Sequence, residues 1–293
     1  MSEQSAYEAY LQRREAIYTD YYSEIWLNPE KRYVSPFRLY GNVWYVGDAW
    51  VCVHLIDTGE GLLLIDSGTV GQEKLLVNAI WEAGFKPCDV KWIIHSHGHL
   101  DHIGAANFFK RLYGTTLYLG APDAEMFRTR PWLSAVQNGY NDCAELFEPD
   151  VEINEGDVLR FGNTEIECRL VPGHTDGCVA LFFDAFDGAE TKRCGYYGGF
   201  GFNTLTKEAL LEKGDTEFRT RRVYLQSLAS VRDQHVDVFL GNHCSNNNTI
   251  GRRKMQLDDP EGPNPFVDET LWGRYLDQKR EEMLCFMADP ANN

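Results

Sequence analysis

The chain has 293 residues, of which 43% are hydrophobic and 13% aromatic, so a large core can be buried and extensive disorder is not expected. Asp and Glu number 44 against 28 Lys and Arg, which gives a formal net charge of −16. Such a charge repels phosphate backbones and anionic membranes, and it argues against a nucleic-acid or membrane partner.

The N-terminus also argues against export. It lacks the basic start, the apolar run and the small-residue cleavage site of a signal peptide, and no window approaches the ~18 consecutive apolar residues of a membrane helix. We therefore expect a cytoplasmic protein. The eight cysteines form no CxxC pair and are expected to be reduced and mostly buried, with Cys178 and Cys244 notable because each lies near a histidine.

The first half of the chain alternates β-rich segments with helices. Apolar residues that recur at i, i+3, i+4 and i+7, or a helix-forming composition, predict helices at 6–24, 72–84, 103–114 and from Ala121. Short runs rich in Val, Ile, Leu and aromatic residues predict strands at 37–47, 51–58, 61–68, 90–97 and 115–120.

The second half repeats this pattern. A hairpin is expected over 158–173, with Gly162 and Asn163 at its turn. Further strands are expected at 178–185, 193–199 and 236–243, and helices at 217–232 and 268–287. The two similar halves, roughly 35–130 and 150–245, lack a low-complexity linker. The pattern therefore predicts a single α/β domain over 1–293, in which two packed sheets carry helices outside, with an N-terminal helical extension (1–34) and a C-terminal helix (262–293).

The stretch HSHGHLDHIG, residues 95–104, places four of the eight histidines within eight positions. Strand side chains alternate with period two, so we expect His97 and His99 to point the same way from a strand end and to bind one metal ion. Asp101 and His102 would follow where the next helix begins, and both could reach a second ion. Imidazole and carboxylate ligands suit zinc, or iron or manganese if more oxygen ligands join.

Four side chains do not complete two metal sites. His174 in PGHTDG and His243 in LGNHCS each follow a predicted strand and are candidate further ligands. His54, His95 and His235 are assigned structural roles; His95 in particular is expected to pack or to hydrogen-bond inside its strand.

Together HSHGHLDHIG, LLLIDSG and VPGHTDG resemble the metallo-β-lactamase superfamily, and the spacing looks most like its β-lactamase subclass with six His and Asp ligands. The resemblance implies a four-layer αββα sandwich with a site for two zinc ions. It assigns His97, His99 and His174 to the first zinc and Asp101, His102 and His243 to the second. It also assigns Asp66 to supporting the ligand loop from outside.

The chain departs at several places from many members of the superfamily or from that subclass, which itself lacks a bridging aspartate. CGYYGGFGFNTL carries no carboxylate where many members of the superfamily have a bridging aspartate, GHTDGC replaces GHTPGS, and three asparagines follow His243-Cys244-Ser245. The resemblance therefore supports the prediction of a metal site more strongly than it supports any particular substrate.

The function expected from the resemblance is zinc-dependent hydrolysis of an amide or ester bond in a small molecule, with β-lactam and lactone rings as candidates. Zinc makes hydroxide available at neutral pH, and Asp101 is placed to orient it and to pass a proton to the leaving group. The alternatives are glyoxalase-type thioester hydrolysis, phosphodiester cleavage, which the acidic charge disfavours, and a non-catalytic metal-binding protein. A homo-oligomer is left open, and no substrate contact is assigned.

Overall fold

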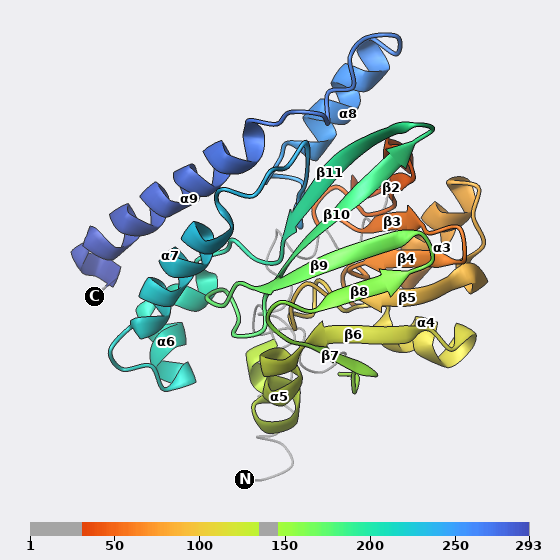
Figure 1. The fold of residues 1–293 in the computed structure, drawn as a ribbon. Coiled ribbons are helices and arrows are strands. Elements are labelled where there is room, and N and C mark those ends of the chain that lie inside the picture. The colour runs from red at the N-terminus through yellow and green to blue at the C-terminus, as the bar shows by residue number, and fades with distance from the viewer. Residues whose placement is uncertain (1–30, 135–145, 293) are drawn as a thin grey trace.

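Two β-sheets lie face to face at the centre of the computed structural model, which describes residues 31–134 and 146–292 (Figure 1). The apolar layer between them joins side chains of both sheets, such as Ile56 and Leu63 on one side and Leu181 and Phe183 on the other. The helix expected at 6–24 lies outside the described residues.

The first sheet has the strand order β1-β2-β3-β4-β5-β6-β7. Its strands are β1 (Phe37–Tyr40), β2 (Val43–Tyr45), β3 (His54–Asp57), β4 (Leu62–Ile65), β5 (Val90–Ile94), β6 (Thr116–Gly120) and β7 (Val151–Ile153). The pairs from β4 to β7 are parallel. Parallel strands covered on both faces read as continuous apolar runs, which explains the fully buried LLLI of β4.

The second sheet has the order β12-β11-β10-β9-β8. Its strands are β8 (Val158–Phe161), β9 (Thr164–Leu170), β10 (Val179–Asp187), β11 (Glu190–Tyr197) and β12 (Val238–Leu240). The turn between β8 and β9 contains Gly162, whose φ of 54° suits a residue without a Cβ, so the predicted hairpin is confirmed.

Helices cover the outer side of each sheet and make four layers, as predicted (Figure 1). Helices α3 (Glu73–Glu82), α4 (Ala106–Tyr113) and α5 (Ala121–Thr129) pack on the first sheet through residues such as Ile80 and Phe109. On the second sheet lie α7 (Arg219–Val231) and α9 (Leu271–Ala288), through residues such as Tyr224 and Trp272. The remaining helices are α6 (Lys207–Lys213) and α8 (Thr249–Asp258), and short 3₁₀ turns are η2 (Pro87–Asp89), η3 (Pro131–Ser134), η4 (Asn203–Leu205) and η5 (Pro290–Asn292).

Several boundaries differ from the prediction. The segment 37–47 is a hairpin rather than one strand, because Gly41 has a φ of 50° and turns the chain between β1 and β2. β7 was not expected and joins the first sheet, so the division between the sheets falls after residue 153 rather than between residues 130 and 150. Helices α6 and α8 were also not predicted; α6 begins where the side chain of Thr206 accepts a hydrogen bond from the amide of Ala209.

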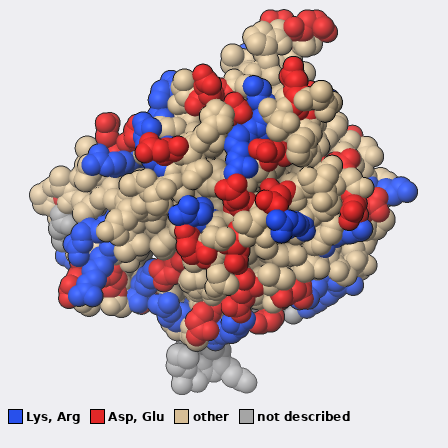
Figure 2. Space-filling model, viewed as in Figure 1, with Lys and Arg blue, Asp and Glu red and all other residues tan. Residues whose placement is uncertain are grey.

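No helix within 31–134 or 146–292 has the combined length and apolar character needed to cross a membrane. On the face drawn in Figure 2, acidic and basic side chains are interspersed. The excess of negative charge is therefore spread among basic residues on this face rather than gathered in one block.

Candidate metal centre

The candidate ligands gather where three strands end at one side of the two sheets. His97, His99, Asp101 and His102 lie in the loop between β5 and α4, His174 follows β9, and His243 follows β12. All six positions predicted from the sequence therefore come from loops at strand ends, and two of these strands belong to the second sheet.

The loop itself differs from the expectation, because β5 ends at Ile94 and α4 begins only at Ala106. His97 and His99 are therefore brought together by a turn and not by strand alternation. Carboxylates replace a neighbouring strand as partners of the loop backbone: Asp66 accepts from the amide of Ser96, and Asp123 from that of Gly98.

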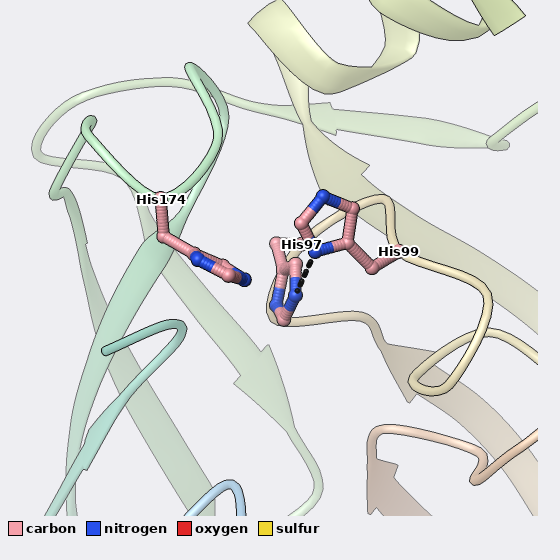
Figure 3. Close-up of side chains that lie close together, drawn as sticks. All are labelled: His97, His99 and His174. Carbon is pink, nitrogen blue, oxygen red and sulfur yellow. Dashed lines mark hydrogen bonds between the residues drawn. The ribbon is translucent and has the colours of Figure 1, made fainter. Parts of the chain in front are cut away.

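His97, His99 and His174 form a first triad whose rings point toward one another (Figure 3). His97 Nε2 lies 3.0 Å from His99 Nδ1, and the ring of His174 lies 4.9 Å from that of His97 and 4.6 Å from that of His99. All three residues are buried, with His174 the most accessible at 8%.

Asp101, His102 and His243 form a second group beside the first. His102 Nε2 lies 3.3 Å from His243 Nε2, and Asp101 Oδ2 lies 3.5 Å from each of these two nitrogens. The rings of His97 and His102 are only 4.2 Å apart, so the two groups adjoin. Candidate ligand atoms of His97, Asp101 and His102 also lie within 4.8 Å of one another.

Asp66 stands behind the second group and is fully buried. Its carboxylate accepts hydrogen bonds from His102 Nδ1 at 2.7 Å, from Tyr196 Oη at 2.5 Å, and from the amide and hydroxyl of Ser96 at 2.7 and 2.9 Å. Its backbone φ is 64°, a conformation that non-glycine residues rarely adopt and that often marks functional sites. Asp66 thus contacts both the ligand loop, at Ser96, and the candidate ligand His102, and its supporting role stays a prediction.

Hydrogen bonds from outside fix which nitrogen faces inward in three of the rings. His102 Nδ1 must donate to Asp66, and His174 Nδ1 donates to the carbonyl of Gly201 at 2.8 Å. His97 Nδ1 lies 3.0 Å from the hydroxyl oxygen of Ser96, which itself donates to Asp66. The Nε2 atoms of all three rings are thereby left with lone pairs toward the centre, as metal ligands require.

The protonation states favour cation binding for most of these rings. Burial, together with neighbouring imidazoles, lowers the pKa of His97 and His99 well below 6.5. Burial also lowers the pKa of His174 and of His243 to about 4. His102 is the exception: burial opposes its charge, but the carboxylates of Asp101 and Asp66 outweigh burial and raise its pKa.

These residues fit two metal ions. Two nitrogens bound to one zinc at 2.0–2.1 Å with tetrahedral angles lie about 3.3 Å apart, which is close to the separations of 3.0 and 3.3 Å found here. Asp101 Oδ1 is buried and has no hydrogen-bond partner, an arrangement that costs free energy unless a cation or water satisfies it.

The residues that were given structural roles stand apart from the cluster. His54 Nε2 contacts the carbonyl of Gly241 at 2.9 Å, and His95 contacts the carbonyl of Tyr118 and the hydroxyl of Ser67, each at 3.2 Å. His235 is on the surface, where its side chain is 68% exposed. His95 therefore forms hydrogen bonds as expected, but it lies one residue beyond the end of β5 rather than inside the strand.

Three residues near the site were missed or undervalued from the sequence. Trp50 places its ring 5.4 Å from that of His243, and Asn246 Oδ1 accepts from the amide of His243 at 2.9 Å and so shapes its turn. Asp123 lies in the first turn of α5, where an aspartate is ordinarily explained by the helix dipole. Nothing local in the sequence shows that it contacts the ligand loops.

The two notable cysteines are not placed as ligands. The Sγ of Cys178 lies 3.2 Å from the hydroxyl of Thr175, and the Sγ of Cys244 lies 3.1 Å from that of Tyr45. Both are buried.

Comparison with known proteins agrees with the fold. The family model of the metallo-β-lactamase superfamily matches residues 51–185. An uncharacterized protein of Aquifex aeolicus is 34% identical over 125 residues, which are 43% of this chain and 54% of that protein. Hydroxyacylglutathione hydrolase GloC of Haemophilus influenzae is 28% identical over 151 residues, which are 51% of this chain and 68% of that protein.

Among solved structures, the subclass B3 metallo-β-lactamase BJP-1 of Bradyrhizobium japonicum superposes with a TM-score of 0.77 at 26% identity, covering 88% of this chain and 95% of that one. The four-layer fold is thus similar to that of the solved metallo-β-lactamase, and the family model of the superfamily matches the part of the chain that carries five of the six candidate ligands. The matched region spans 54% of the first curated relative's length.

Proposed function

We propose that the protein is a zinc-dependent hydrolase that cleaves an amide or ester bond in a small molecule, with β-lactam and lactone rings as candidate substrates. Two metal ions would be held by His97, His99 and His174 and by Asp101, His102 and His243. One observation carries the proposal: inward-facing nitrogens from loops of both sheets converge at ligand separations. The outer nitrogens of His97, His102 and His174 are held by hydrogen bonds.

Zinc, when bound, lowers the pKa of water to about 7 and polarises a carbonyl oxygen, which replaces a strong base and an oxyanion hole. The protein's own groups supply the rest. Asp101 can hold the attacking water through its unpartnered Oδ1 and pass the proton to the leaving group. Asp66 keeps the proton of His102 on Nδ1 and so fixes the direction of Nε2.

A thioester of the glyoxalase type is the second candidate substrate, because one relative is named as a hydroxyacylglutathione hydrolase. The same residues would serve, since a thioester carbonyl is attacked in the same way as an ester carbonyl. A non-catalytic role predicts a degraded ligand set, whereas all six positions here carry ligand-type side chains. Iron or manganese in place of zinc would change the metal that is found in the protein, but the same six residues would bind it.

The test combines metal content with a substrate panel. Purified protein is analysed for zinc, iron and manganese and then assayed on a chromogenic β-lactam, a lactone series and a glutathione thioester. We expect close to two ions per chain and turnover in one class, both lost in His97→Ala and both kept in His235→Ala, which removes an exposed histidine outside the cluster. Protein that neither contains nor takes up metal would refute the proposal.

A further inference from the structure

Asp123 is a buried carboxylate that the hydrolase proposal leaves without a role. It is fully buried, and it lies in the first turn of α5, directly after β6 of the first sheet (Figure 1). It contacts no candidate ligand side chain by hydrogen bond. Its partners instead belong to the two loops that carry the first triad.

Both oxygens of Asp123 are occupied by these loops. Oδ2 accepts from the amide of Gly98, between His97 and His99, at 2.7 Å, and also from the hydroxyl of Thr175 at 2.7 Å. Oδ1 accepts from the amide of Gly177 at 2.7 Å. The carboxylate therefore joins the HxH loop of the first sheet to the loop of the second sheet that carries His174.

The chain segments at this junction pack so closely that neither Gly120 nor Gly177 has room for a side chain. A Cβ on Gly177 would lie 2.5–2.7 Å from atoms of Asp123, and a Cβ on Gly120 would lie 2.1 Å from the carbonyl oxygen of Gly177. Two glycines thus allow α5 and the His174 loop to approach closely enough for the three hydrogen bonds to form.

We propose that Asp123 is a positioning residue that sets the separation of His97 and His99 from His174, and thereby the metal affinity of the first triad. This inference rests on the proposed metal centre. Three charge-assisted hydrogen bonds of 2.7 Å hold two otherwise independent loops in one geometry. Comparable outer partners of metal ligands change affinity by about 10–100-fold when they are removed.

Asp123→Asn is the main variant, because it keeps the shape but replaces one acceptor oxygen with an NH₂ group that faces a donor. Asp176→Asn is the matched control: it removes the same charge from the His174 loop, but Asp176 is bound to the side chain of Lys213 and is 40% exposed. Thr175→Val removes only one of the three hydrogen bonds and serves if Asp123→Asn does not fold.

The first site is isolated by making each variant in a His243→Ala background, which removes a ligand from the second group. Zinc dissociation constants are measured by competition with a chromogenic chelator, and the stability of the metal-free protein by urea unfolding. We expect zinc affinity about 10–100-fold weaker for Asp123→Asn, a smaller loss for Thr175→Val, and no change for Asp176→Asn.

Unchanged zinc affinity in Asp123→Asn, or in Thr175→Val if the former does not fold, would overturn the inference, even if the metal-free protein were less stable. Equal losses in Asp176→Asn would also overturn it, because charge rather than the hydrogen bonds would then be responsible. If the parent protein takes up no zinc, the proposed function has failed instead, and the two failures are thereby distinguished.

Discussion

Replacing Asp66 with Asn tests how the second metal group is held. The substitution removes a buried charge that accepts four hydrogen bonds, including those from His102 and Tyr196. Whichever way the amide turns, its NH₂ group faces donors that it cannot satisfy. Hydrogen bonds to a charged group contribute about 1.5–3 kcal/mol each, so losing one or two of them predicts a loss of about 1.5–6 kcal/mol in unfolding free energy.

The loss should also appear in metal binding, because His102 would no longer be fixed with its proton on Nδ1. We expect about 10–100-fold weaker binding of the second zinc, measured by chelator competition, while the first triad is less affected. Asp233→Asn is the control, since it makes the same charge change at a side chain that is 90% exposed. If Asp66→Asn matched this control in both urea unfolding and zinc affinity, the role assigned to Asp66 would be wrong.

Three further substitutions test the core and the electrostatics. Burial lowers the pKa of His54 from 6.5 to about 4, so its neutral form contributes stability above pH 6.5, and about 2 kcal/mol of this is lost by pH 5. In metal-free protein, the unfolding free energy measured with urea should fall between pH 7 and pH 5 by about 2 kcal/mol less in His54→Gln than in the parent protein. An equal fall in both proteins would contradict the assignment. Trp272→Ala should cost about 3–5 kcal/mol in urea unfolding because Trp272 is 1% exposed, whereas Trp81→Ala, at a residue 55% exposed, should cost far less. Gly120→Ala forces a Cβ within 2.1 Å of the Gly177 carbonyl oxygen and should lower the thermal midpoint of metal-free protein by several degrees; an unchanged midpoint would show that the two backbones can separate freely.

The long, periodic elements were predictable because each carries its own signal. The apolar runs of β4 and β5 and the spacing in α3 indicate their structure within a few residues. The elements that were not predicted are short or lack a regular apolar pattern. β7 has three residues and is a strand because it pairs with β6, so its identity depends on a partner distant in the sequence.

The candidate site was likewise predictable only in part. Its six candidate ligands could be named in advance, because histidine and aspartate at such spacing are rare outside metal sites. The reason why they converge could not be read locally: β5 ends before His97, and carboxylates bind the loop backbone where a neighbouring strand was expected. Asp66 was found only through the LLLIDSG motif, and Asp123 was missed because its partners, Gly98 and Gly177, lie 25 and 54 residues away.

The two buried carboxylates hold the centre by different physical means. Asp66 contacts an imidazole directly, so it sets both the direction of His102 and its basicity, and its negative charge helps to raise the pKa of that ring. Asp123 contacts backbone amides and a hydroxyl, so it sets where the rings of the first triad lie without bonding to any of them. A centre that must hold two cations close together needs both kinds of control: charge compensation near the second group, and a fixed distance between the sheets at the first. The geometry of the centre is thus maintained from outside the ligand set. Asp66 directly follows β4 and Asp123 lies in the first turn of α5 after β6, and both strands belong to the sheet whose β5–α4 loop carries four of the six candidate ligands.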